Sequence, residues 1–241
     1  MKNLSPLQKM LPVYCIVLTV FLLIGISGNH AITVLTESAP ISNRSCVVID
    51  AGHGGVDGGA TSCTGILESN INLQIALKLD PLMHLLGIKT LMIRKTDISV
   101  YTEGCTTITA KKVSDLNNRV NTINNTQNGL VISIHQNTFS DSRYNGAQVF
   151  YAPTQGSELL AKKTQTAFVQ SLNPGSNRQA KKANSVYLMQ KIQCTGILVE
   201  CGFLSNTQEE ALLRSDAYQK KLCCVLASVC SSYLCSEQQL T

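Results

Sequence analysis

The most constraining feature of the sequence is an apolar segment that runs directly into a glycine-rich loop around a histidine. Residues 47–50 have the composition of a buried strand, and residues 51–60 contain five glycines on both sides of His53. Glycine adopts backbone conformations that strain other residues, and it leaves space beside the imidazole ring. We therefore expect another group to approach His53 closely.

Two further apolar segments, residues 130–134 and 197–199, each end on a polar residue, and an amphipathic segment after the glycine loop opens with a glutamate. The carboxyl ends of parallel strands meet at one edge of a sheet, where α/β enzymes place their functional groups. The side chains that we expect to converge at this edge are His53, Glu68, His135 and Glu200.

Strand-like and helix-like segments alternate along the rest of the chain. The expected strands cover residues 46–50, 88–93, 130–134, 146–151 and 193–200, and the expected helices cover residues 71–86, 115–123, 158–172, 208–213 and 217–234. Pro81 indicates either a kink in the first helix or a restart with Asp80 as its N-cap. The alternation predicts one α/β domain with three layers, in which helices cover both faces of a mainly parallel mixed sheet.

One long segment, Asp97 to Lys112, shows no periodicity and contains Gly104 and several threonines. We expect it to form a loop, and long loops of this kind often cover functional sites. Our interpretation is that this loop controls access to the edge of the sheet.

The N-terminal part of the chain differs from the rest. A charge-free apolar stretch from Leu11 to Ile26 follows Lys2 and Lys9, which is typical of a signal peptide or an uncleaved signal anchor within residues 1–27. Both alternatives remain open, because a stretch of about 16 residues is near the lower limit for crossing a bilayer. We expect export, contact with the membrane through this segment, a linker over residues 28–45, and a single domain over residues 46–236.

The charge of the chain narrows the classes of partner. The net charge of +5 fits an anionic polymer or an anionic membrane surface, but no stripe of Lys and Arg with interleaved aromatics supports a nucleic-acid partner.

The chain has ten cysteines, and in an exported protein these would suggest disulfides. Several lie in apolar surroundings and none has C-x-x-C spacing, so we expect them mainly to pack as small hydrophobes.

Two histidines and a carboxylate are the ligand set of a catalytic zinc site, in which water takes the fourth position. We expect His53, Glu68 and His135 to bind one Zn²⁺. A zinc ion lowers the pKa of bound water from near 16 to about 7 and polarises a carbonyl group. Glu200 is then available as a general base and afterwards as an acid, because its apolar flanks should raise its pKa towards neutrality.

Simpler interpretations exist for each residue taken alone. A single histidine at a strand end is more often a hydrogen-bonded structural residue than a ligand, and a glutamate at a helix start often only interacts with the helix dipole. We interpret His84 as structural and His30 as part of the linker. Asp50 and Asn137 are candidates for orienting the ligands. Residues 178–182 (Arg-Gln-Ala-Lys-Lys) form either a solvated face or a contact for substrate carboxylates.

Five segments together carry a resemblance to a known family: residues 50–60, Glu68, Leu116-x-x-Arg119, residues 133–137 and residues 198–206. They resemble the zinc-dependent N-acetylmuramoyl-L-alanine amidases of bacterial cell walls, and the similarity extends over about residues 46 to 234. The resemblance implies a helix-flanked sheet, one zinc ion bound by His53, Glu68 and His135, and a catalytic glutamate at Glu200. These are the same four residues that the ends of the expected strands, the glycine loop and the start of the first helical segment already indicated.

Within that family, residues 135–137 (His-Gln-Asn), residues 177–185 and the absence of a recognisable wall-binding module resemble the germination-specific amidases of endospore formers. This likeness implies removal of stem peptides from the muramic acid of peptidoglycan, towards muramic δ-lactam in the spore cortex. It also implies an extracytoplasmic location in the developing spore envelope. Dependence on an accessory protein that orders the site remains open. Ala51 departs from the family, which more often has proline there.

Two other functions remain open at this point. A zinc peptidase that cleaves within the stem peptide would use the same three ligands, and a non-catalytic muropeptide-binding protein would share the fold. Product analysis distinguishes them, because only an amidase releases a peptide with a new N-terminal alanine and leaves a peptide-free muramic acid.

Overall fold

The computed structural model of the chain describes residues 45–238. The expected signal segment, and all but the last residue of the expected linker, lie outside the described residues. Within residues 45–238, no helix combines the length and the apolar character needed to cross a bilayer.

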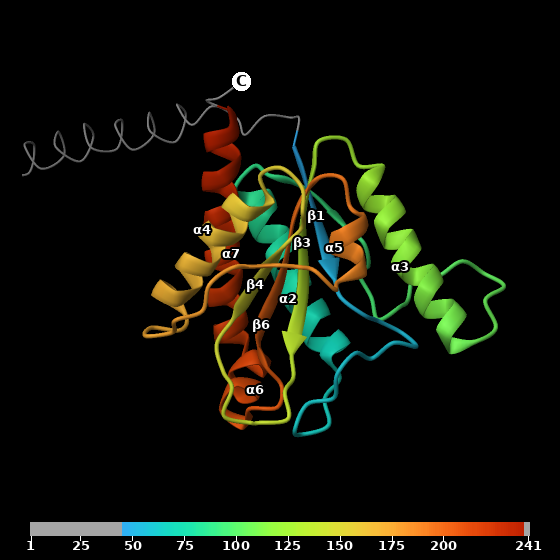
Figure 1. Cartoon of the computed structure of the whole chain (residues 1–241), viewed down its shortest axis with the longest axis horizontal. Helices are drawn as coiled ribbons and strands as arrows, with labels where there is room; N and C mark the ends of the chain where they lie inside the picture. The colour runs from blue at the N-terminus through green and yellow to red at the C-terminus, as the bar shows by residue number, and fades with distance from the viewer. Residues whose placement is uncertain (1–44, 239–241) are drawn as a thin grey trace, which may run out of the picture. The chain divides into compact units, whose positions relative to one another are not determined.

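A six-stranded mixed sheet forms the centre of the domain (Figure 1). Its strands, in spatial order, are β2 (Lys89–Met92), β1 (Cys46–Ala51), β3 (Gly129–Asn137), β6 (Thr195–Phe203), β4 (Gln148–Tyr151) and β5 (Lys181–Lys182). All neighbours are parallel except β4 and β6, which are antiparallel. The central strands are apolar on both faces, as a sheet covered on both sides requires.

Helices cover the two faces of this sheet (Figure 1). They are α2 (Glu68–Leu85), α3 (Ile108–Asn124), α4 (Ser157–Ser171), α5 (Tyr187–Lys191), α6 (Thr207–Arg214) and α7 (Asp216–Gln238). Side chains of α2, α4, α6 and α7 pack with one face of the sheet in the larger hydrophobic core, and those of α3 and α5 pack with the other. The prediction of a three-layer α/β domain with a mainly parallel mixed sheet is confirmed.

The first helix is continuous across Pro81, so the predicted restart is wrong. Its buried side chains Ile75, Leu79 and Met83 continue one apolar face on both sides of the proline, which is itself exposed. Asp80 does not cap a new helix, because its carboxylate accepts a hydrogen bond from Thr90 Oγ1 at 2.5 Å instead.

The segment expected as a long loop is shorter than predicted. Helix α3 begins at Ile108, where the side chain of Thr107 accepts a hydrogen bond from the main-chain nitrogen of Ala110. This N-cap satisfies a main-chain donor that the helix leaves free. The first turns of α3 are mostly exposed, so their sequence shows no apolar periodicity and did not indicate a helix. Helix α5 and the short strand β5 were also not expected.

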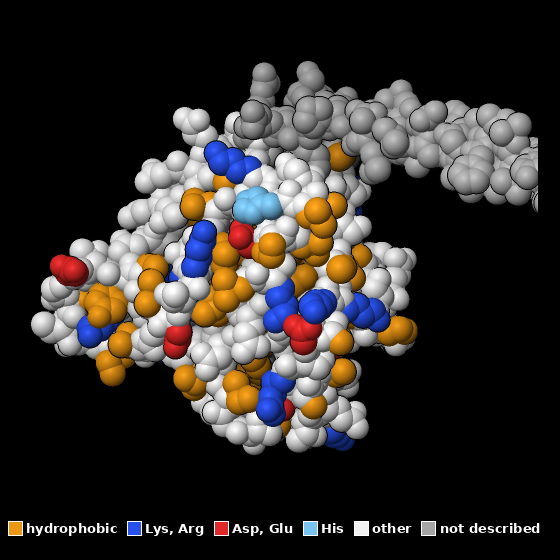
Figure 2. All heavy atoms as spheres, turned by 180° about the vertical axis from the view of Figure 1, so that it is seen from behind, with side chains coloured by type: hydrophobic (Ala, Val, Ile, Leu, Met, Phe, Trp, Pro, Cys, Tyr) orange, Lys and Arg blue, Asp and Glu red, His pale blue; other side chains and the backbone are white. Residues whose placement is uncertain are grey.

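The face of the molecule seen from behind shows charged side chains of both signs among exposed hydrophobic ones (Figure 2). Lys and Arg side chains stand in several places on this face, and Asp or Glu side chains lie next to some of them (Figure 2).

Replacing a core aromatic residue tests this packing. Phe168 of α4 is 0% exposed, and we expect Phe168→Ala to lower the free energy of unfolding by about 3–5 kcal/mol, because the cavity adds to the lost burial. Phe139→Ala is the matched control, since that ring is 51% exposed. Urea denaturation followed by circular dichroism measures both, and equal losses in the two variants would contradict the assignment of the core.

Candidate active site

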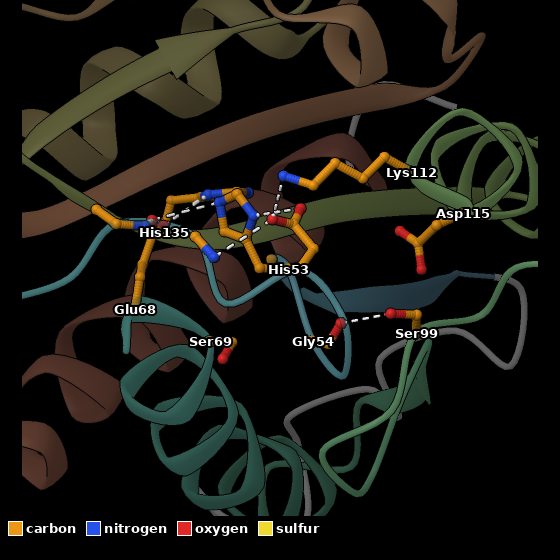
Figure 3. Close-up of polar contacts among 12 residues, drawn as sticks. His53, Gly54, Glu68, Ser69, Ser99, Lys112, Asp115 and His135 are labelled. Atoms are coloured by element: carbon orange, nitrogen blue, oxygen red, sulfur yellow. Dashed lines mark hydrogen bonds and ion pairs between the residues drawn. The ribbon is translucent and has the colours of Figure 1, made fainter. Parts of the chain in front are cut away.

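The four residues selected from the sequence lie at the carboxyl edge of the parallel strands, and Figure 3 shows three of them, His53, Glu68 and His135, close together. His53 lies in the loop after β1, Glu68 is the first residue of α2, and His135 lies near the end of β3. Glu200 of β6 is the register partner of His135 on the neighbouring strand. One ligand atom from each of His53, Glu68 and His135 lies within 4.8 Å of the others.

The two imidazoles approach the same carboxylate. His53 Nε2 lies 3.3 Å from Glu68 Oε2, and His135 Nδ1 lies 3.0 Å from Glu68 Oε1. The two rings are nearly perpendicular, with centroids 4.9 Å apart. Burial opposes charge on Glu68, but hydrogen bonds and charge from His135 and His53 outweigh it and hold the pKa of this carboxyl well below its usual range. The carboxylate is therefore charged at neutral pH, as a metal ligand must be.

Glycines make this convergence possible. A Cβ atom at Gly52 would lie 2.3 Å from the ring of His135, and one at Gly59 would lie 2.6 Å from Glu68 Oε2 and 2.7 Å from His53 Cδ2. The loop backbone therefore packs directly against the three candidate ligands. Two imidazole nitrogens and one carboxylate, held this close together, fit the donor set of a zinc ion with three protein ligands.

The orientation of His53 depends on an aspartate that sequence reasoning missed. Asp57 Oδ2 lies 2.8 Å from His53 Nδ1, and Lys112 Nζ lies 2.8 Å from Asp57 Oδ1 (Figure 3). Burial lowers the pKa of His53, but Glu68 and Asp57 outweigh it and raise this pKa to about 9. A carboxylate on one ring nitrogen directs the other towards a metal. The signal in the sequence that could have indicated this contact is that Asp57 follows His53 by four residues within the glycine loop.

Glu68 has its own orienting groups. Its Oε1 atom accepts hydrogen bonds from the main-chain nitrogen of Gln136 at 3.0 Å and from Asn72 Nδ2 at 3.3 Å. Gln136 and Asn72 are also hydrogen bonded to each other. The main-chain carbonyl of Asn137 accepts a hydrogen bond from the main-chain nitrogen of Leu204, and the orienting role that the sequence suggested for the Asn137 side chain stays a prediction.

Glu200 lies beside the cluster. Its Oε2 atom is buried and has no hydrogen-bond partner among residues 45–238. Burial, with a smaller contribution from Glu68, outweighs the attraction of His135 and His53 and raises the pKa of Glu200 to about 7. A buried polar atom without a partner is costly, so it marks a place where a ligand or water interacts.

Arg119 fixes the backbone that presents His53. Its side chain, 2% exposed, donates to Asp50 Oδ1 at 2.5 Å, to the Ala51 carbonyl at 2.9 Å and to the His53 carbonyl at 2.7 Å. Asp50 also accepts a hydrogen bond from Ser133 Oγ at 2.6 Å. Asp50 therefore contacts Arg119 and Ser133, and Arg119 contacts the loop backbone.

The loop before α3 supports the glycine loop from the outside. Asp97 Oδ1 accepts a hydrogen bond from the main-chain nitrogen of Gly55 at 2.9 Å, and Ser99 Oγ donates to the Gly54 carbonyl at 2.5 Å (Figure 3). Control of access by this loop stays a prediction, because these contacts show only that its first residues are fixed against the glycine loop.

The other residues singled out in the sequence lie outside this cluster. His84 Nε2 contacts Thr90 Oγ1 on the exposed side of α2, and His30 lies outside the described residues. Arg178 donates to the Asn145 carbonyl and to Gln148, and its guanidinium lies 4.9 Å from the centre of the Phe203 ring. All nine cysteines of the described part are free, four of them buried.

Comparison with known proteins identifies the family. Residues 47–228 match the family described as N-acetylmuramoyl-L-alanine amidase. The chain belongs to this family. The amidase is therefore a hydrolase of the bond between N-acetylmuramic acid and L-alanine, which decides against the two alternatives that the sequence left open.

Individual relatives agree with this assignment. The amidase is 36% identical to the germination-specific N-acetylmuramoyl-L-alanine amidase of Bacillus subtilis, over 77% of each chain. Its structure resembles the CwlD amidase from Clostridioides difficile, solved in complex with the GerS lipoprotein, with a TM-score of 0.75, 36% identity, and coverage of 78% of this chain and 98% of that one. A second amidase structure, from Clostridium difficile 630, gives a TM-score of 0.69 at 29% identity, over 80% of this chain and 98% of that one.

Removal of the buried cation should destabilise the amidase strongly. We expect Arg119→Met to lower the free energy of unfolding by about 3–5 kcal/mol, because it leaves the carboxylate of Asp50 buried without its partner. Arg143→Met is the control, since the Arg143 side chain is 89% exposed and pairs with Asp141 at the surface, so stability should not change. Urea titration of both variants measures the difference, and a neutral Arg119→Met would contradict this role.

Proposed function

We propose that the amidase is a zinc hydrolase in which His53, Glu68 and His135 bind the ion and Glu200 transfers the proton. The observation that carries this proposal is the convergence of three ligand atoms within 4.8 Å, beside a glutamate whose buried Oε2 atom has no hydrogen-bond partner in the described part of the chain. A bound zinc ion supplies an electrophile that acidifies water and polarises a carbonyl group.

The remaining chemistry belongs to Glu200. The bond that breaks joins the lactyl carbonyl carbon of muramic acid to the nitrogen of L-alanine, and the bond that forms joins that carbon to the oxygen of water. Glu200 accepts a proton from the water and returns it to the departing nitrogen as the amide bond breaks. A pKa of about 7 suits both steps at neutral pH, because the group is neither a very weak base nor a very weak acid.

We propose that the substrate is the stem peptide on muramic acid in spore-cortex peptidoglycan, as a step towards muramic δ-lactam. The support is the 36% identity to a germination-specific amidase over 77% of both chains. The same likeness supports a location in the developing spore envelope. Export and membrane contact through residues 1–27 are further proposals, and the charge-free apolar stretch from Leu11 to Ile26 supports them. An accessory protein is a further proposal, because the similar CwlD amidase was solved with the GerS lipoprotein.

Replacing the proposed proton carrier should separate chemistry from metal binding. We expect Glu200→Gln to retain zinc but to lose about 10²- to 10⁴-fold in kcat, because the amide cannot accept the proton. By contrast, His135→Ala should lose the metal itself. Glu158→Gln is the control, since that carboxylate is 55% exposed and pairs with Lys162.

Zinc content and the masses of glycan fragments from purified peptidoglycan provide the readouts for these variants. The amidase product is a peptide with a new N-terminal alanine and a muramic acid without peptide. Full activity in Glu200→Gln would remove the proposed mechanism.

The glycine loop offers a test that leaves every candidate ligand in place. A methyl group at Gly59 would collide with Glu68 and His53, so we expect Gly59→Ala to weaken zinc binding by about 10- to 100-fold. Gly65→Ala is the matched control, because Gly65 also has a positive φ, 88° against 69°, but no atom lies within 4 Å of its added Cβ. Competition titration with a zinc chelator measures both, and equal affinities would argue against a metal bound at this loop.

A further inference from the structure

A cavity lies between the candidate ligands and the helices α3 and α5. Its volume is about 350 Å³, and it is lined on one side by Gly52, His53 and His135. The opposite side includes the apolar residues Leu116 of α3 and Leu188 of α5. Ligand pockets in proteins commonly have volumes of this size or larger. The cavity therefore has room for part of a substrate beside two of the candidate metal ligands, His53 and His135.

Two cations line this cavity, and only one of them has donors left for a ligand. Arg119 is 2% exposed, and its guanidinium donates to Asp50, Asp115 and the carbonyls of the glycine loop. Lys112 is 48% exposed, and its ammonium contacts Asp57 at 2.8 Å. An ammonium group carries three N–H donors, so Lys112 can bind a second acceptor without leaving Asp57.

The position of Lys112 close to His53 indicates which part of the substrate its ammonium can contact. A single carboxylate, that of Asp57, separates its ammonium from the imidazole of His53, with 2.8 Å on each side. An extended peptide advances about 3.3–3.6 Å per residue, so a group this close to a candidate metal ligand can contact a peptide residue within one or two positions of the scissile amide. The residue that follows L-alanine is such a residue, and its carboxyl group can be free or amidated.

We propose that Lys112 binds the free carboxylate of the residue that follows L-alanine, and that it makes the amidase prefer such stem peptides over amidated ones. This proposal rests on the proposed function of the same site. A primary amide of the same shape carries no charge, so it gains less from the ammonium. Lys112 is then a specificity-determining residue on α3, while the proton transfer stays with Glu200.

The test uses two soluble muropeptides that differ only in whether this carboxyl group is free or amidated. With the zinc-loaded full chain, we expect wild type to prefer the free form roughly 10-fold in kcat/KM, mainly through KM, because a charged hydrogen bond to a half-exposed group has a limited effect. Lys112→Gln should lose this preference, so that its ratio of kcat/KM between the free and the amidated peptide falls to about 1. Lys111→Gln is the matched control, because the neighbouring Lys111 lies over the ring of Tyr101 and does not line the cavity.

A binding measurement makes the test independent of turnover. Calorimetric titration of Glu200→Gln with each muropeptide should show the same preference, and adding Lys112→Gln to that variant should abolish it. Equal binding of the two peptides by Glu200→Gln, or a preference that survives Lys112→Gln, would overturn the role of Lys112. Neither result would affect the proposed function, which instead fails if zinc-loaded wild type binds both peptides and cleaves neither.

Discussion

The buried guanidinium of Arg119 is the interaction on which the arrangement of the site depends. It joins α3 to the end of β1 and to the loop that presents His53, by hydrogen bonds to the Asp50 carboxylate and to the carbonyls of Ala51 and His53. Burial opposes the charge on Asp50, but Arg119 and Ser133 outweigh it and lower the pKa of this carboxyl. A buried ion pair of this kind contributes little net stability, so its main effect is to impose one geometry.

That geometry includes backbone strain at the candidate ligand itself. His53 has φ 60°, a left-handed conformation that costs a residue with a side chain of the order of 1–3 kcal/mol. The strain persists because Arg119 holds the carbonyl of His53 while Asp57 holds its ring. These two contacts fix the orientation of the imidazole, and the neighbouring glycines allow Glu68 and His135 to approach it. Preorganisation of this kind lowers the free-energy cost of binding.

The architecture could be predicted from the sequence because apolar strands and amphipathic helices each have a characteristic period. The proximity of His135 and Glu200 could be predicted because parallel strands align their carboxyl ends. The sequence did not predict the roles of Asp57, Lys112 or Asn72, which depend on the path of a glycine loop and on helices packed against it. The early start of α3 was also missed, because exposed turns carry no apolar period. Whether the four converging residues bind zinc and transfer a proton remains a proposal that the geometry supports.

Lys112 and Arg119 lie on the same helix, seven residues apart, which is close to two full turns. Lys112 contacts the Asp57 carboxylate, and Arg119 donates a hydrogen bond to the His53 carbonyl. A displacement of α3 as a rigid rod would therefore alter the cavity and the candidate ligand together. Contacts to the ring and to the backbone of His53 would then change at the same time.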